Sequence, residues 1–200
     1  PVDYQPANVL EVDDSEWPHF FKMPVLMLML ITLLNDGTLI SIGYDNVTPS
    51  KLPNNWNLRV VFCVATLLAS VALISSLILL YWGLDSWNPD GVFQSIGLPG
   101  LKYGQLSTMM YLKVSISDFL TLFSARTHDG YFWSSTPSPI LIGAACFALA
   151  LSTLLACVWP TTEPDHQWVE GLMTAGPLPV YIWVFCLFWW VVQDVTKVAL

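Results

Sequence analysis

Five long apolar segments dominate this chain of 200 residues and limit the folds that it can adopt. Each segment is long enough, at about 1.5 Å per helical residue, to cross the roughly 30 Å hydrocarbon layer of a bilayer. The segments lack the sustained apolar–polar alternation of barrel strands, so helices are the remaining way to satisfy backbone polar groups in lipid. We therefore predict an all-α integral membrane protein with spans at 20–42, 58–82, 107–125, 139–159 and 177–199.

The composition agrees with a membrane protein, because 54% of the residues are hydrophobic and only 11% are charged. The net charge of −8 does not indicate a nucleic-acid partner. The acidic residues cluster before the first span, between the second and third spans, and between the fourth and fifth, which places them on one side. The other side is richer in basic residues, and by the positive-inside bias it is cytoplasmic. The basic residues that decide this orientation are Lys51, Arg59, Arg126 and Lys197.

This orientation predicts an amino end outside, a carboxyl end inside and an extracellular lead-in at residues 1–19. The lead-in has no basic n-region followed by an apolar h-region, as a signal peptide would. We therefore expect something upstream to deliver the amino end outside. A chain that begins at Pro1 without Met also reads as part of a larger polypeptide.

The first span contains an acid, Asp36, between Asn35 and Gly37. An ionised Asp at mid-helix costs about 2.5–3.5 kcal/mol on insertion scales, so such residues usually pair, line a wet cavity or carry protons. Asn35 can donate and accept hydrogen bonds, and Gly37 would permit a locally unwound turn. We interpret Asp36 and Asn35 as a candidate functional site, with Thr32 and Gly37 as its polar support. The alternative is a packed helix with a satisfied polar pair.

The third span is the least apolar, and its polar residues recur at three- or four-residue steps, which predicts a face turned toward the protein interior. These residues are Ser107, Tyr111, Ser115, Asp118 and Thr121. Lys113 and Asp118 are five residues apart and point about 140° away from each other, so we do not expect them to pair. Asp118 lies about 16 Å from Ser107, which predicts a shallower position than that of Asp36. We interpret Asp118 and Ser115 as polar lining, and we expect a neutral replacement of Asp118 to be tolerated.

The remaining reactive side chains indicate no chemistry of their own. The four cysteines lie in the spans without a Cys-x-x-Cys pair or a His at ligand spacing, so we predict small buried hydrophobes and no metal site. We identify no catalytic residue in the chain. Asp194 and Lys197, three residues apart at the inner end of the fifth span, can pair and anchor it.

Several motifs occur in an order that resembles the carboxyl-terminal membrane half of P-type plasma-membrane proton-pumping ATPases. Residues 33–38, which read Leu-Leu-Asn-Asp-Gly-Thr, are similar to the sixth transmembrane helix of that family, and residues 44–50 to the loop after it. Residues 111–118 through Arg126 resemble the eighth helix, and residues 132–135 the following loop. The segment 193–197, Gln-Asp-Val-Thr-Lys, resembles the tenth helix.

The resemblance implies that the five spans are helices six to ten of a ten-helix bundle in the plasma membrane. By the same resemblance, Asp36 matches the carboxylate that accepts and releases the transported proton, with Asn35 beside it. The position of Asp118 varies in the family between acid and amide. The family's asparagine partner and arginine release group lie on earlier helices, which this chain lacks.

The sequence also lacks the family's Asp-Lys-Thr-Gly phosphorylation motif, its nucleotide pocket and its actuator loop. ATP and Mg are therefore expected on missing cytoplasmic domains, and the chain alone should be inactive. The implied partners are the lipid bilayer, the missing amino-terminal helices and the cytoplasmic domains, and a homo-oligomer is left open. Two other readings stay open: a secondary transporter or channel built around Asp36, and a noncatalytic pump-like subunit. An inverted repeat would favour the transporter, and we see none.

Overall fold

The computed structural model describes residues 23–46, 57–127, 130–159 and 170–199. No strand occurs among these residues, and the predicted all-α class is confirmed. The α-helices are α1 (Val25–Ile42), α2 (Leu58–Leu84), α3 (Val92–Ser95), α4 (Tyr103–Ala125), α5 (Pro139–Val158) and α6 (Leu178–Val198), with a 3₁₀ helix, η1 (Leu172–Ala175).

The long helices of the described residues lie where the spans were predicted, with shifts at two starts. The helix α1 begins only at Val25, after the extended backbone of Pro24, whereas the predicted span began at residue 20. The helix α4 begins at Tyr103, ahead of the predicted residue 107. The predicted lead-in, residues 1–19, lies outside the described residues.

Local sequence signals fix the starts of the helices in the second half of the chain. The hydroxyl of Ser138 accepts the backbone N–H of Leu141 at 3.2 Å, and Pro139 follows in the first turn of α5, where its missing N–H costs nothing. At the start of α4, the side-chain oxygen of Gln105 accepts the backbone N–H of Lys102 at 3.1 Å. These caps satisfy backbone groups that a helix end leaves free.

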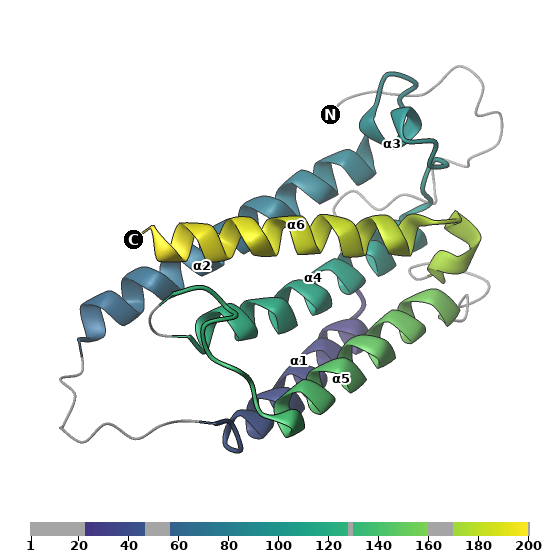
Figure 1. The fold of residues 1–200 in the computed structure, drawn as a ribbon. Helices are drawn as coiled ribbons and strands as arrows, with labels where there is room; N and C mark the ends of the chain where they lie inside the picture. The colour runs from purple at the N-terminus through teal and green to yellow at the C-terminus, as the bar shows by residue number, and fades with distance from the viewer. Residues whose placement is uncertain (1–22, 47–56, 128–129, 160–169, 200) are drawn as a thin grey trace.

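The helix α4 lies at the centre of the bundle (Figure 1). It packs against α1, α2, α5 and α6, while α1 also packs on α5, and α2 on α6. Consecutive long helices run in opposite directions, so the ends of α1, α4 and α6 lie together with the starts of α2 and α5 (Figure 1). The short elements α3 and η1 lie at the other end. This alternation is the arrangement that five crossings require.

Most side chains of α4 are buried, which matches its central place. Leu106, Met109 and Leu112 are fully buried and form the core with side chains of the surrounding helices. The helix α2 comes very close at Gly83, where an added Cβ would lie 2.5 Å from Cδ1 of Leu106. Small residues permit this kind of close approach between helices in membranes.

Within the described residues, four helices are long and apolar enough to cross a membrane: α1, α2, α5 and α6. The helix α4, which corresponds to the predicted span at 107–125, is not among these four. Lys113, Asp118 and several hydroxyl side chains make α4 more polar, and its neighbours cover it, so it need not face lipid. That α4 also crosses the membrane stays a prediction, which its place inside the bundle supports.

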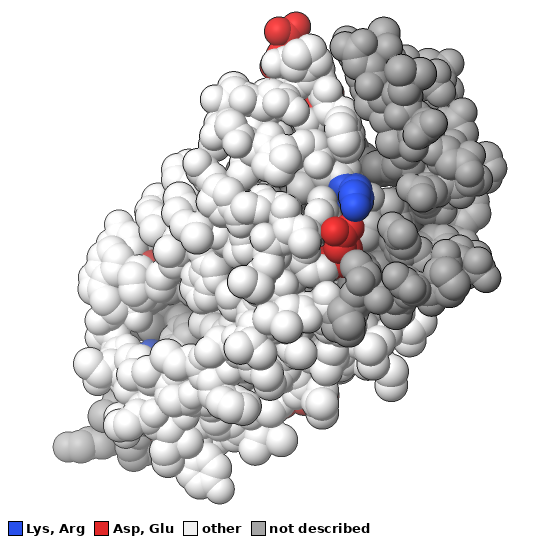
Figure 2. Space-filling model, turned by 90° about the vertical axis from the view of Figure 1, so that its right-hand side faces the viewer, with Lys and Arg blue, Asp and Glu red and all other residues white. Residues whose placement is uncertain are grey.

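The outer surface of the bundle is apolar. Figure 2 shows a face on which Lys, Arg, Asp and Glu side chains are sparse. Large apolar side chains are exposed on the outer helices, among them Phe62 on α2, Phe147 on α5 and Phe188 on α6. An apolar surface of this extent suits hydrocarbon rather than water, and the protein is an integral membrane protein.

Candidate functional site

Asp36 lies on an uncovered face of α1. The buried face of this helix consists of Met27, Ile31, Thr38 and Ser41, whereas Asp36 is exposed. Its carboxylate forms no hydrogen bond or ion pair with the described residues, so the alternative of a satisfied polar pair is not realised within them. The described part of the chain thus leaves the predicted proton-binding acid without a partner.

Thr32 and Gly37 are also exposed on α1. The hydroxyl of Thr32 donates to the carbonyl of Leu28 at 3.0 Å, and no atom lies within 4 Å of a Cβ built on Gly37. The sequence allowed an unwound turn at Gly37, but α1 is a continuous helix from Val25 to Ile42, so that expectation is wrong for this structure. Because the backbone carbonyls here stay within the helix, polar side chains alone supply the site.

A groove of about 430 Å³ runs between α1 and α4 and brings two predicted site residues together. Asn35 lines it from α1, and Asp118 lines it from α4. The remaining lining is mostly apolar, with a hydroxyl from Thr121 and the side chain of Arg126, which directly follows α4. The carboxylate of Asp118 accepts no hydrogen bond from the described residues. The groove is therefore lined by a carboxylate from α4 and an amide from α1, and Asp36 is not among its lining residues.

Asp118 lines the same groove as Asn35, the residue next to Asp36. An ion pair between Arg126 and Asp45 joins the ends of α4 and α1 at this end of the bundle. That Asp118 lies shallower in the membrane than Asp36 stays a prediction.

Ser115 lies away from this groove. It is buried, and its hydroxyl lies 2.7 Å from the hydroxyl of Ser152 on α5. This contact joins α4 to α5 on the inner side of the bundle. Of the predicted polar lining, the structure thus brings Asp118 to Asn35 and separates Ser115 from both.

The ion pair at the inner end is a feature that the sequence did not reveal. Nε of Arg126 donates to Oδ2 of Asp45 at 2.8 Å, and both side chains are about 95% buried, with exposed fractions of 5% and 6%. Arg126 also donates to the carbonyl of Ser135 at 2.8 Å, and the backbone N–H of Ser138 donates to Oδ1 of Asp45 at 2.9 Å. The pair therefore ties together the ends of α1 and α4 and the start of α5.

These contacts set the charge state of Asp45. Burial by itself raises the pKa of a carboxyl, but the hydrogen bonds from the Ser138 N–H and the Arg126 guanidinium outweigh it, and the pKa of Asp45 is lowered. Asp45 is thus held ionised beside Arg126, which lines the groove.

The inner end of α6 is fixed by the predicted pair. Nζ of Lys197 lies 3.4 Å from Oδ1 of Asp194, and both side chains are buried. Asp194 also accepts the hydroxyl of Ser124 at 2.6 Å, and Lys197 donates to the hydroxyl of Thr127 at 2.7 Å. These contacts attach the end of α6 to the end of α4, which agrees with the predicted anchoring role.

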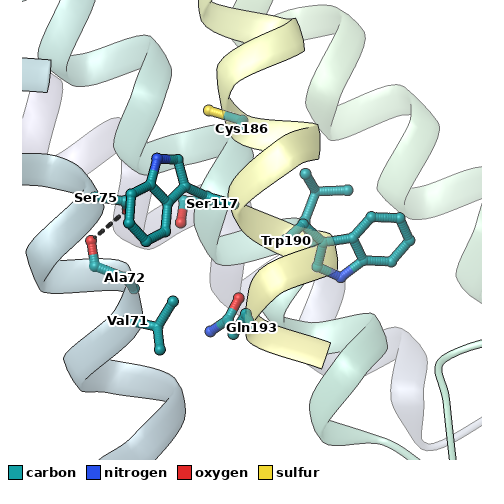
Figure 3. Close-up of a pocket in the computed structure, with 9 residues that line it drawn as sticks. Val71, Ala72, Ser75, Ser117, Cys186, Trp190 and Gln193 are labelled. Atoms are coloured by element: carbon teal, nitrogen blue, oxygen red, sulfur yellow. Dashed lines mark hydrogen bonds between the residues drawn. The ribbon is translucent and has the colours of Figure 1, made fainter. Parts of the chain in front are cut away.

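A second, much smaller cavity lies between α2, α4 and α6 (Figure 3). Its volume is about 10 Å³, which is room for one water molecule at most. Ser75, Ser117 and Gln193 give it polar walls, and Gln193 also donates to the carbonyl of Leu68 at 2.9 Å. The cavity suits a structural water between helices rather than a ligand. Among the described residues, no group of His, Cys, Asp and Glu could hold a metal ion.

Comparison with known proteins points to one class. No protein-family model matches the chain. The chain is 50% identical over 192 residues to "Probable proton ATPase 1A" and 50% identical over 188 residues to "Probable proton ATPase 1B", both of Leishmania donovani. It is 29% identical over 192 residues to "Probable plasma membrane ATPase" of Dictyostelium discoideum.

The three alignments each cover 90% of this chain, but they cover 20%, 19% and 18% of those proteins. The chain therefore spans about a fifth of the length of the curated relatives that it matches. The resemblance predicted from the motifs is confirmed: over nine-tenths of its length, the chain is homologous to part of the proton and plasma membrane ATPases.

Proposed function

We propose that the chain is part of the membrane domain of an ATP-driven proton pump of the plasma membrane, and that Asp36 carries the proton. The observation that carries this proposal is an exposed acid on the apolar helix α1, in a chain 50% identical to a protein named as a proton ATPase. A carboxylate that faces lipid is costly, so Asp36 needs a covering partner. The rest of such a pump would supply helices to cover it.

In this proposal, residues of α1 and α4 have different roles in proton transport. Asp36 takes up and releases the proton, Asn35 offers hydrogen bonds beside it, and Asp118 keeps the neighbouring groove polar. One pKa unit corresponds to about 1.36 kcal/mol, so a modest change in hydration between two pump conformations suffices to load and discharge a carboxyl. ATP and Mg would bind on cytoplasmic domains outside this chain, which provides no catalytic residue of its own.

The test is replacement of Asp36 in the full-length pump that carries this sequence. Asp36→Asn keeps the size of the side chain but removes the ionisable oxygen, so ATP-driven acidification of vesicles should stop while membrane insertion is unchanged. Asp90→Asn is the matched control, because Asp90 is exposed on the turn before α3 and should transport normally. Full proton pumping by Asp36→Asn would remove Asp36 from the carrier role.

A second experiment separates the pump from a channel. The purified chain alone in liposomes should neither hydrolyse ATP nor pass protons. Its co-expression with the family's amino-terminal helices and cytoplasmic domains, as a separate chain, should give vanadate-sensitive acidification. An ATP-independent proton leak through the chain alone, abolished by Asp36→Asn, would favour the channel and count against the pump.

A further inference from the structure

Lys113 is a charged side chain that the proposed mechanism does not use. It lies at the middle of α4 and is 1% exposed. Its Nζ donates to the carbonyl of Ala72 at 3.0 Å and to the hydroxyl of Ser76, both on α2. Within the described residues, no carboxylate forms an ion pair with it. An ammonium buried at this depth on two neutral acceptors needs a compensating charge.

Asp118 is the nearest acid along the same helix. It lies five residues further, about 7.5 Å along the axis and on a different face, where it lines the groove beside Asn35. In the described part of the chain, the two side chains form no hydrogen bond or ion pair with each other, so an attraction between them acts through the interior of the bundle. At such a separation, Coulomb attraction remains substantial wherever the effective dielectric constant is well below that of water.

We propose that Lys113 is the internal counter-cation of Asp118. Its ammonium is fixed by oxygens of α2 and compensates the carboxylate through the body of α4. The carboxylate lines the groove, and no guanidinium or ammonium among the described residues forms an ion pair with it. The inference deepens the proposed function. Its transport experiment depends on that function, whereas its unfolding experiment does not.

The alternative is that Lys113 serves only to tie α4 to α2 through its two hydrogen bonds. The two accounts differ in their dependence on Asp118. If Lys113 compensates a charge, its loss is harmful because Asp118 remains uncompensated, and neutralising Asp118 relieves the harm. If Lys113 only joins α4 to α2 by hydrogen bonds, replacing it has the same effect whether residue 118 is Asp or Asn.

A double-mutant cycle on the purified chain in detergent tests the inference. We expect Lys113→Met to lower the midpoint of thermal unfolding by about 5–10 °C. Adding Asp118→Asn should then raise the midpoint by several degrees, although Asp118→Asn alone does not raise it. If Asp118→Asn has the same effect with and without Lys113→Met, the inference is overturned.

Two control variants separate charge from hydrogen bonding. Ser76→Ala removes one acceptor of Lys113 but leaves its charge, so Asp118→Asn should give no rescue of this variant. Lys113→Arg keeps the charge and should not be improved by Asp118→Asn either. If Lys113→Met cannot be purified, recovery of folded protein in the double variant supports the inference, and failure of the double variant while Asp118→Asn folds contradicts it.

Transport provides the second measurement, in the full-length pump. Lys113→Met should slow ATP-driven acidification, and the double variant should regain at least half of the original rate. Equal rates for the single and double variants would overturn the inference for transport. If the unmodified protein does not pump at all, the proposed function fails, while the unfolding cycle still decides whether Lys113 compensates Asp118.

Discussion

The carboxylate of Asp45 shows what one residue does for this bundle. Asp45 lies just after α1. Its carboxylate accepts a hydrogen bond from the guanidinium of Arg126 at the end of α4 and another from the backbone N–H of Ser138 at the start of α5. Three segments that are distant in the sequence thus meet on a single pair of oxygens. Removing one partner of a buried ion pair is strongly destabilising, because the other charge remains buried without compensation.

At the residue scale we predict that Asp45→Asn lowers the free energy of unfolding by about 3 kcal/mol at pH 7. The reason is that the buried guanidinium of Arg126 is left without a compensating charge. Denaturant unfolding of the purified chain in detergent measures this difference. Asp90→Asn removes an exposed acid and should change the stability by less than about 0.5 kcal/mol. Equal stability of the two variants would contradict the organising role of the pair.

The same residue predicts a pH dependence. The pKa of Asp45 is lower in the folded chain than its ordinary value of about 3.9, so its contribution to stability is complete above that value. The contribution is lost as the pH falls through the folded-state pKa. As the pH falls from about 3.9 through the folded-state pKa, the unfolding midpoint of the original chain should therefore approach that of Asp45→Asn. Parallel curves for the two proteins would refute this assignment.

At the scale of one element, α4 differs from its neighbours because four other helices pack against it and most of its side chains are buried. Its fit against α2 depends on Gly83, where a Cβ would meet Leu106 at 2.5 Å and Met109 at 2.7 Å. Both side chains are fully buried, so they have little room to move. A larger residue at position 83 has to push α2 away from α4.

We therefore predict that Gly83→Leu destabilises the chain by about 1–3 kcal/mol. Gly143→Leu is the matched control, because Gly143 also lies inside a helix, but no atom lies within 4 Å of its Cβ position. The control should be neutral or slightly stabilising, since Gly is a poor helix former. Unfolding in detergent compares the two, and equal losses would show that the close approach at Gly83 does not matter.

At the scale of the whole molecule, the helix directions give a topology that labelling can test. Single cysteines would replace Asp90, on the turn before α3, and Trp133, on the segment between α4 and α5, after the four native cysteines are removed. By the positive-inside bias, an impermeant reagent should label position 90 in intact cells and position 133 only after permeabilisation. Labelling in the opposite pattern would invert the predicted orientation.

Much of the architecture follows from the sequence, because the apolar length of each span determines where a helix can lie. The pairing of Asp194 with Lys197 was also predictable, since three residues place two side chains on one helix face. The ion pair of Asp45 and Arg126 was not, because the two residues are 81 positions apart and no local pattern links them. The groove between α1 and α4 was not predictable for the same reason, because residues far apart in the sequence line it.

The burial of α4 among its neighbours also bears on how the protein is made. A translocon releases a helix into lipid one segment at a time, and Lys113 and Asp118 make α4 a poor candidate for release alone. The helices α5 and α6, which cover much of it, are synthesised only afterwards. Stable insertion of α4 should therefore depend on later segments, so that a nascent chain ending at Ala125 would fail to hold it, whereas a chain extended through α6 would retain it.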